Sequence, residues 1–180
     1  MADKKRYWSS EELIVIGTFA GLIKVSTMLI ALAGGGMNPI TLVLKNIVAT
    51  TLLIVLVYKV RKFGVLSLYS VIVSLVSLML MGSNAMTFAG SLVAGVICDG
   101  LIFLTGGHQR TFSLVFGVAF FDFFSRFISL GYSYFLYQEE FKLFVIGAVF
   151  VTLGYVGCLI GLGTGVLFAK ELKHAGIIRQ

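Results

Sequence analysis

The chain has 180 residues, of which 58% are hydrophobic and 12% are charged, and its net charge is +6. Soluble domains average about 45–50% apolar and about 25% charged residues, so this balance excludes an ordinary soluble domain. One proline and two cysteines exclude collagen-like and disulfide-stapled proteins, and 14 Lys and Arg residues spread along an apolar chain exclude a nucleic-acid-binding face. The composition predicts a polytopic membrane protein.

Six apolar stretches are separated by short polar or glycine-containing segments. They cover residues 13–33, 39–58, 65–81, 86–105, 111–137 and 141–169. Each is near the length of about 20 residues that a helix needs to cross a bilayer, and 65–81 is the shortest. None alternates with period two as a β-barrel strand would. The sequence therefore predicts one all-α domain over residues 1–180, a six-transmembrane-helix bundle with short loops.

The polar N-terminal segment predicts where the first helix begins. Ser9 and Glu12 have the spacing of a capping box, in which each side chain bonds to the backbone of the other residue. Tyr7 and Trp8 precede this box and suit the membrane–water interface. The basic start is not followed directly by an apolar run, so we do not expect a cleavable signal here.

Basic residues predict the orientation of the bundle. An even number of spans places both termini on one side of the membrane. That side would carry ten basic residues, namely Lys4, Lys5, Arg6, Lys59, Arg61, Lys62, Arg110, Lys170, Lys173 and Arg179. The opposite side carries only Lys142. Lys and Arg close to span ends stay in the cytoplasm, so we expect both termini to be cytoplasmic and the protein to lie in the plasma membrane.

Small residues form stripes on the first and last spans. Gly17 and Gly21 are one turn apart, a spacing that lets two helices approach closely in lipid. The last span repeats this pattern at Gly147, Gly154, Gly157, Gly161 and Gly165. Two interpretations are open for each pair: close packing between helices of this chain, which is the usual use, or a surface for another protein.

Five charged residues lie inside the predicted spans: Lys24, Lys45, Asp99, Asp122 and Arg126. A charge at the bilayer centre costs about 2.5–3.5 kcal/mol on insertion scales, so each one needs a partner, a cavity or a function. Asp122 and Arg126 are four residues apart, and an internal ion pair that fixes helix packing is one interpretation of them. A ligand site is the other.

Polar residues in the half of the spans away from the termini form a candidate substrate site. Its residues are Lys24, Asn38, Thr41, Lys45, Asn84, Thr87, Arg126, Ser129, Tyr132 and Tyr155. The three cations in this set face a single carboxylate, Asp122, so the site has an excess of two positive charges. Such a site favours a ligand with a carboxylate or phosphate group. Glu139 and Glu140 on the outer surface would instead favour a cationic ligand.

Several catalytic motifs are absent from the sequence. There is no nucleotide-binding P-loop and no serine elbow of the Gly-x-Ser-x-Gly type. The two histidines are not grouped with carboxylates or cysteines as metal ligands would be, and Cys98 and Cys158 lie within spans as small apolar residues. We expect a protein that is not an enzyme and that needs no cofactor or metal.

Residues 8–21, WSSEELIVIGTFAG, together with six tight spans and a glycine-patterned last helix, resemble the substrate-binding S components of energy-coupling factor (ECF) transporters. The resemblance implies capture of a vitamin-like micronutrient in the outward half of the bundle, under the loop at 34–38 and the outer ends of the last three spans. It also implies work with a transmembrane T component and a pair of ABC ATPases. Gly17 and Gly21 would dock on the T component, where the family usually has alanines.

Two other functions are compatible with the sequence. One is a small secondary transporter or channel that works alone, with Asp99 or Asp122 coupling transport to protons; it should show internal repeats, and we see none. The other is a non-catalytic subunit of a membrane assembly, in which Asp122 and Arg126 would brace the helices.

Overall fold

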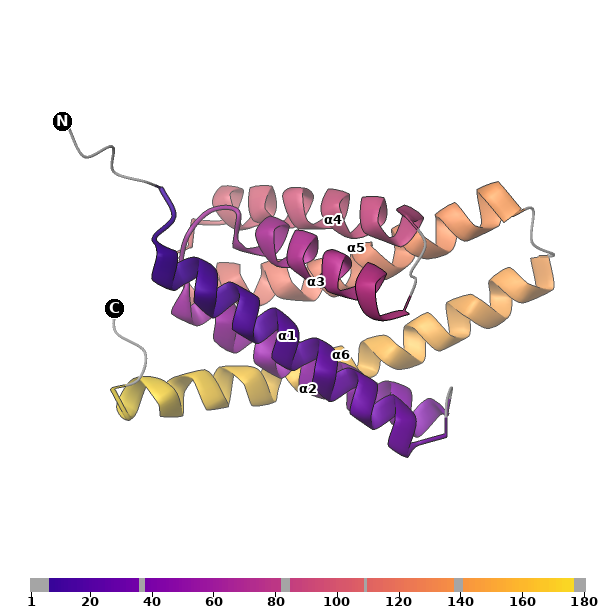
Figure 1. Cartoon of the computed structure of the whole chain (residues 1–180), viewed down its shortest axis with the longest axis horizontal. Helices are drawn as coiled ribbons and strands as arrows, with labels where there is room; N and C mark the ends of the chain where they lie inside the picture. The colour runs from indigo at the N-terminus through magenta and orange to yellow at the C-terminus, as the bar shows by residue number, and fades with distance from the viewer. Residues whose placement is uncertain (1–6, 36–37, 82–84, 109, 138–140, 177–180) are drawn as a thin grey trace.

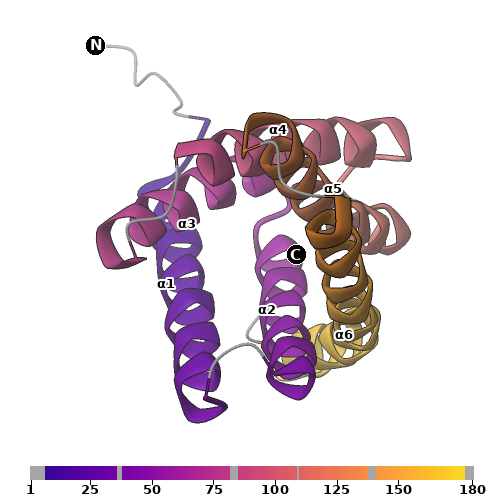
Figure 2. The ribbon, with the colours of Figure 1, turned by 90° about the vertical axis from the view of Figure 1, so that its right-hand side faces the viewer.

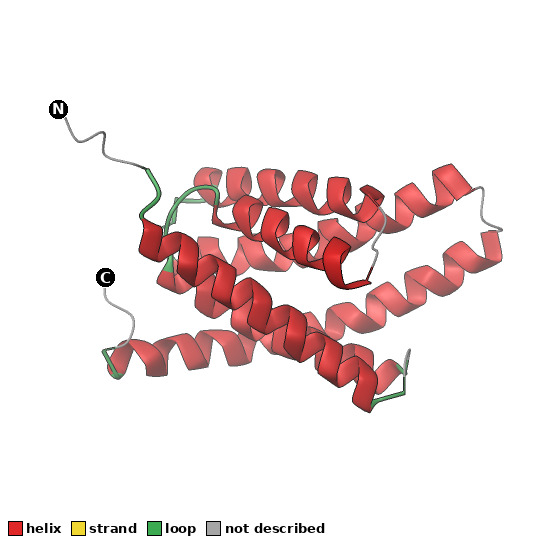
Figure 3. Cartoon of the chain, viewed as in Figure 1, coloured by secondary structure: helices red, strands yellow, loops and turns green. Residues whose placement is uncertain are grey.

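The computed structural model describes residues 7–35, 38–81, 85–108, 110–137 and 141–176. Within them all regular structure is helical (Figure 3). The six helices, in order along the chain, are α1 (Ser10–Ala33), α2 (Pro39–Lys59), α3 (Val65–Met81), α4 (Ala85–Leu104), α5 (Thr111–Tyr137) and α6 (Phe141–His174). The prediction of an all-α fold with six helices is confirmed, and their order is shown in Figure 1.

Four of the helices contain segments that are long and apolar enough to cross a membrane. These segments are Ser10–Ala33, Pro39–Lys59, Thr111–Ile128 and Phe144–His174. The remaining two helices contribute the shorter apolar segments Val65–Met79 and Phe88–Leu104. The structure is therefore that of an integral membrane protein with several apolar helices.

The first helix begins where the capping box predicts. The Ser9 hydroxyl accepts a hydrogen bond from the backbone N–H of Glu12 at 3.2 Å, and the Glu12 carboxylate accepts one from the backbone N–H of Ser9 at 2.9 Å. Lys62, between α2 and α3, donates to the same carboxylate at 2.7 Å and to the carbonyl oxygen of Tyr7 at 2.8 Å. The start of α1 is thus tied to the α2–α3 connection.

The helices close a ring. Helix α1 packs against α2 and α3, α3 against α4, α4 against α5, α5 against α6, and α6 against α2. Helix α2 also contacts α5 across the ring. Figure 2 shows this arrangement end-on, with α1 at the left, α2 in the middle, α6 at the right, and α3 and α4 across the top. The start of α1 and the end of α6 lie at the same end of the ring (Figure 1).

The glycine stripe of α6 packs against α2 of the same chain. A Cβ on Gly157 would stand 2.6 Å from the carbonyl oxygen of Val43, and one on Gly161 would stand 2.8 Å from that of Ile47. Backbone-to-backbone approaches this close are open only to glycine. The interpretation that this stripe packs helices within the chain is confirmed.

The apolar core fills the half of the ring next to the termini. Its largest fully buried members include Ile16 in α1, Ile54 in α2, Leu66 in α3, Ile102 in α4 and Leu114 in α5. Each lies in the part of its helix nearest the terminal end. Buried apolar area stabilises by about 25 cal/mol per Å² in water, and in lipid close packing takes over that role. Beyond this core, toward the middle of the helices, polar side chains of α2 and α5 face each other.

Candidate functional site

A hydrogen-bonded polar cluster joins α2, α5 and α6 near the middle of each helix. The Thr50 hydroxyl donates to the Asp122 carboxylate at 2.6 Å. Arg126, one turn further along α5, donates through Nη2 to Oδ1 of Asn46 at 2.5 Å. The Asn46 amide in turn donates through Nδ2 to the carbonyl oxygen of Gly154 at 2.9 Å. We call these five residues the polar cluster.

The two charges of α5 do not pair directly. Within the part of the chain that the structure describes, the one ion pair within 4.0 Å is Lys62 with Glu12. Asp122 and Arg126 each bond to a neutral side chain of α2 instead. Their bracing role, which one interpretation of the sequence assigned to an ion pair along α5, therefore runs between α5 and α2.

Cys158 of α6 lies against the polar cluster. Its thiol is fully buried, and the sulfur lies 4.0 Å from Nη2 of Arg126. Neither cysteine is in a disulfide, and each fills its helix interface as a small side chain.

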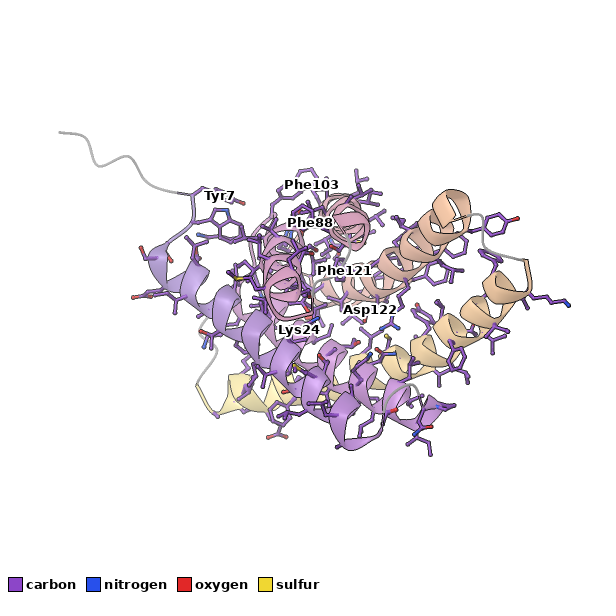
Figure 4. All side chains as sticks on the ribbon, turned by 45° about the vertical axis from the view of Figure 1, so that its right-hand side comes forward. Tyr7, Lys24, Phe88, Phe103, Phe121 and Asp122 are labelled. Carbon is purple, nitrogen blue, oxygen red and sulfur yellow. The ribbon has the colours of Figure 1, made fainter. Side chains whose placement is uncertain are left out.

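Two lysines lie beside the polar cluster without a counter-ion. Lys24 of α1 and Lys45 of α2 are both half-buried and within electrostatic range of each other, and Lys45 is within the same range of Arg126. Among the residues that the structure describes, neither ammonium group has a hydrogen-bond acceptor or an acidic partner. Figure 4 places Lys24 and Asp122 in the middle of the molecule.

The charges of the site sum to a positive excess. Lys24, Lys45 and Arg126 contribute three positive charges, and Asp122 contributes one negative charge, so the sum is plus two. Lys45 is the seventh residue of α2, about 10 Å along a helix that rises about 1.5 Å per residue. The excess therefore lies well inside the apolar part of the protein, in the half away from the termini.

Asn38 and Thr41, which the sequence also placed in the site, brace the α1–α2 turn. The Asn38 amide donates to the carbonyl oxygen of Gly34 at 2.8 Å, and the Thr41 hydroxyl donates to that of Asn38 at 2.7 Å. A Cβ on Gly34 would overlap the Thr41 methyl group, and Gly35 has a φ of +67°. These two glycines form a tight turn, while Gly36 and Met37 lie outside the described residues.

Tyr155 lies next to the polar cluster on α6. Its half-buried ring packs edge-on against Phe123 with centroids 5.6 Å apart, and it interacts electrostatically with Asp122 and Cys158. The remaining predicted positions lie outside what the structure describes: all of Asn84, Glu139 and Glu140, and the side chains of Thr87, Ser129 and Tyr132.

Residues 10–142 match a family model described as hypothetical bacterial integral membrane protein (Trep_Strep). The match covers well over half of the 180 residues. The chain belongs to the Trep_Strep family. Searches of curated proteins and of solved structures gave no match.

Three members of the site in this Trep_Strep protein were missed by sequence reasoning. Asn46, Thr50 and Cys158 are uncharged, and single polar residues of this kind occur in membrane helices for many reasons. One signal was present: Asn46 and Thr50 are four residues apart, as are Asp122 and Arg126. Two helices that face each other with equal spacing can form two cross-links one turn apart.

The surface of the Trep_Strep protein also has two apolar grooves. One, of about 340 Å³, is lined by Pro39, Ile40, Val43, Leu44 and Ile47 of α2. The other, of about 420 Å³, is lined by Phe144, Val145, Ala148, Val149, Thr152 and Leu153 of α6. Neither lining includes a charged residue. Among the described residues no three His, Cys, Asp or Glu side chains are grouped to hold a metal ion.

Proposed function

We propose that this protein captures a small anionic micronutrient, of the size and chemistry of a vitamin, as the S component of an ECF-type transporter. The observation that carries the proposal is the pair of half-buried lysines, Lys24 and Lys45, with no counter-ion in the described part of the protein. Uncompensated cations inside a membrane are expensive, and an anionic ligand offsets that cost when it binds. Binding and release, without chemical change of the ligand, need no catalytic group.

The outward face of α1 supports a partnership with a scaffold subunit. Apart from neighbouring residues and the backbone of α1 itself, no atom in the described part of the chain lies within 4 Å of where a Cβ on Gly17 or Gly21 would stand. Ile14, Leu22 and Val25 on the same helix are exposed. The α6 glycines from Gly157 to Gly161 pack on α2, whereas this pair meets no other described helix, as a docking surface for the T component and its ABC ATPases would require.

We further propose that all six helices cross the plasma membrane with both termini in the cytoplasm. Successive connections alternate between the two ends of the ring, so α3 and α4 share the depth of their longer neighbours. The described basic residues outside the spans support the orientation, because they lie at the terminal end except for Lys142.

Mass spectrometry of the gently purified protein tests the proposal. We expect one small anionic molecule retained per chain, and uptake of that molecule into liposomes only when the T component and ATPases are also present. An empty protein that moves solute alone would establish the stand-alone transporter instead. An empty protein that moves nothing, even with the partners, would favour an assembly subunit.

A further inference from the structure

The guanidinium group of Arg126 already has partners within the protein. Its Nη2 donates to Asn46 at 2.5 Å, and its Nη1 lies 2.9 Å from where a Cβ on Gly154 would stand, so this end of the guanidinium is packed against α6. Asp122, one turn away on the same helix, cancels the charge within the cluster. Arg126 and Asp122 thus form a neutral brace, and the excess of two positive charges belongs to Lys24 and Lys45.

The two lysines lie on neighbouring helices, Lys24 on α1 and Lys45 on α2. Helices α1 and α2 pack against each other, and their lysines repel each other electrostatically from half-buried positions. Each ammonium group has three N–H donors, and none of these donors has an acceptor within the described residues. Folding has placed two half-buried like charges on neighbouring helices, close enough to interact, which is unfavourable until something with two negative charges joins them.

We propose that Lys24 and Lys45 together hold one doubly charged phosphate group of the substrate. The inference rests on the proposed function and names the chemical class of the ligand. A phosphate monoester carries about −1.5 to −2 charges at pH 7 and has three strong acceptor oxygens. It therefore balances both lysines at once, whereas a monocarboxylate leaves one charge uncompensated.

The residue types support phosphate over a planar carboxylate. Arginine is the residue that suits a carboxylate, through two parallel N–H bonds, and the Arg126 fork is engaged with α2 and packed on α6. Lysine acts as a compact point charge with rotatable donors, which fits a tetrahedral anion approached from two sides. The phosphate of a lipid headgroup has the same chemistry, so the test must separate the two sources.

Thermal unfolding of the full chain in phosphatidylcholine nanodiscs tests the lysine pair, with inorganic phosphate as the probe. We expect phosphate, and sulfate as a second dianion, to raise Tm saturably at constant ionic strength, while acetate at ten times the concentration does not. Lys24→Met and Lys45→Met should each weaken the apparent phosphate Kd about tenfold or more. Lys142→Met, which removes an exposed cation from the first turn of α6, is the matched control and should keep the full shift.

The variants should fold, because each replaces an uncompensated charge by an apolar side chain of similar length. Without added anion we expect their Tm to equal or exceed that of the unmodified protein. No saturable shift with phosphate, an equal shift with acetate, or an undiminished shift in both lysine variants would overturn the phosphate site.

Native mass spectrometry separates the sources of phosphate and keeps the two proposals distinct. A retained phosphorylated metabolite that is lost in both lysine variants supports the inference. A retained phospholipid lost in the same variants would overturn its assignment to the substrate. Retention of a monocarboxylate vitamin would overturn this inference and leave the proposed function intact, whereas phosphate binding without retained metabolite or uptake would overturn the proposed function.

Discussion

A buried charge in this protein is structural or functional according to what surrounds it. Asp99 of α4 is 1% exposed, yet it accepts hydrogen bonds from the backbone N–H groups of Leu66 and Ser67 at 3.3 and 2.9 Å and from the Ser67 hydroxyl at 2.6 Å. These groups form the first turn of α3, where backbone donors are unpaired and the helix dipole favours an anion. Asp99 is therefore a cap for α3, whereas Lys24 and Lys45 have no comparable partner.

His108, between α4 and α5, gives a test of pH dependence at the residue scale. Its ring is 9% exposed and packs edge-on against Phe63, and Nε2 has no hydrogen-bond partner in the described part of the chain. Burial lowers the pKa of His108, and the Asp99 carboxylate opposes that shift. The folded protein thus prefers the neutral ring more strongly than the unfolded chain does, in which the pKa is about 6.5.

The sign of the effect follows from this preference. The contribution of His108 to stability is fully present above about pH 6.5 and is lost as the pH falls below it, because the unfolded chain then binds the proton more readily. We expect Tm to fall between pH 7.5 and 5, and His108→Leu to flatten that fall. His174→Leu, which changes an exposed histidine at the end of α6, is the control. An equal fall in all three proteins would contradict the assignment to His108.

At this scale the sequence was informative about charges and uninformative about neutral polar groups. Lys24, Lys45 and Arg126 were predicted to belong to the site because a charge in hydrocarbon is too costly to be incidental. Asn46 and Thr50 carry no such cost when a backbone carbonyl is nearby, so only the packed helices show that they bind Arg126 and Asp122.

At the scale of elements, hydropathy located the helices but not all of their ends. Helix α6 continues to His174, beyond the apolar limit predicted at 169, because Lys170, Glu171, Leu172 and Lys173 favour helix outside the membrane as well as inside it. Helix α1 likewise begins at Ser10, set by its capping box rather than by its first apolar residue. Hydropathy marks where a helix leaves lipid, and capping marks where it ends.

The α2–α6 contact gives a test at this scale. Gly157→Ala would place a methyl group 2.6 Å from the carbonyl oxygen of Val43, which is backbone and cannot move aside without separating the helices. Overpacking of this kind costs about 1–3 kcal/mol, so we expect a clear loss of thermal stability. Gly163→Ala is the matched control, since no described atom lies within 4 Å of the added group and that side of α6 is exposed. Equal Tm values for the two variants would show that α6 does not pack on α2 this tightly.

At the scale of the whole molecule, the order of the helices was beyond the sequence. Many helices carry small or polar faces, and nothing in one chain states which face meets which. The stripe from Gly154 to Gly165 could have faced a partner, and only its fit to α2 assigns it to the interior. Gly17 and Gly21 of α1 are also four residues apart, but no other helix of the described chain packs against them.

That open pair leads to a prediction about assembly. Under the proposed function, leucine at both Gly17 and Gly21 should abolish co-purification with the T component and substrate uptake, because two bulky side chains prevent close approach. Ligand retention by the isolated chain should be unchanged. Gly100→Leu, at another glycine with no described atom within 4 Å of its Cβ position, is the control. Undiminished uptake by the double variant would remove this face from the docking surface.

Cysteine labelling in intact cells tests the orientation. A membrane-impermeant maleimide should label Lys142→Cys directly but should label Lys173→Cys only after the cells are opened, because the two positions lie at opposite ends of α6. The native thiols give little background, since Cys98 and Cys158 are both fully buried. The reverse pattern would invert the proposed topology.

The neighbouring residues Lys45 and Asn46 link two properties of α2. Lys45 interacts electrostatically with Lys24 of α1, and Asn46 is bonded to Arg126 of α5 and to the α6 backbone. The glycines of α6 also hold α2 closely, since Cβ atoms on the stripe from Gly154 to Gly165 would stand within 3 Å of α2 atoms. The proposed anion would therefore lie beside a pair of helices that close contact joins along much of their length, and the end of α6 lies at the opposite end of that pair.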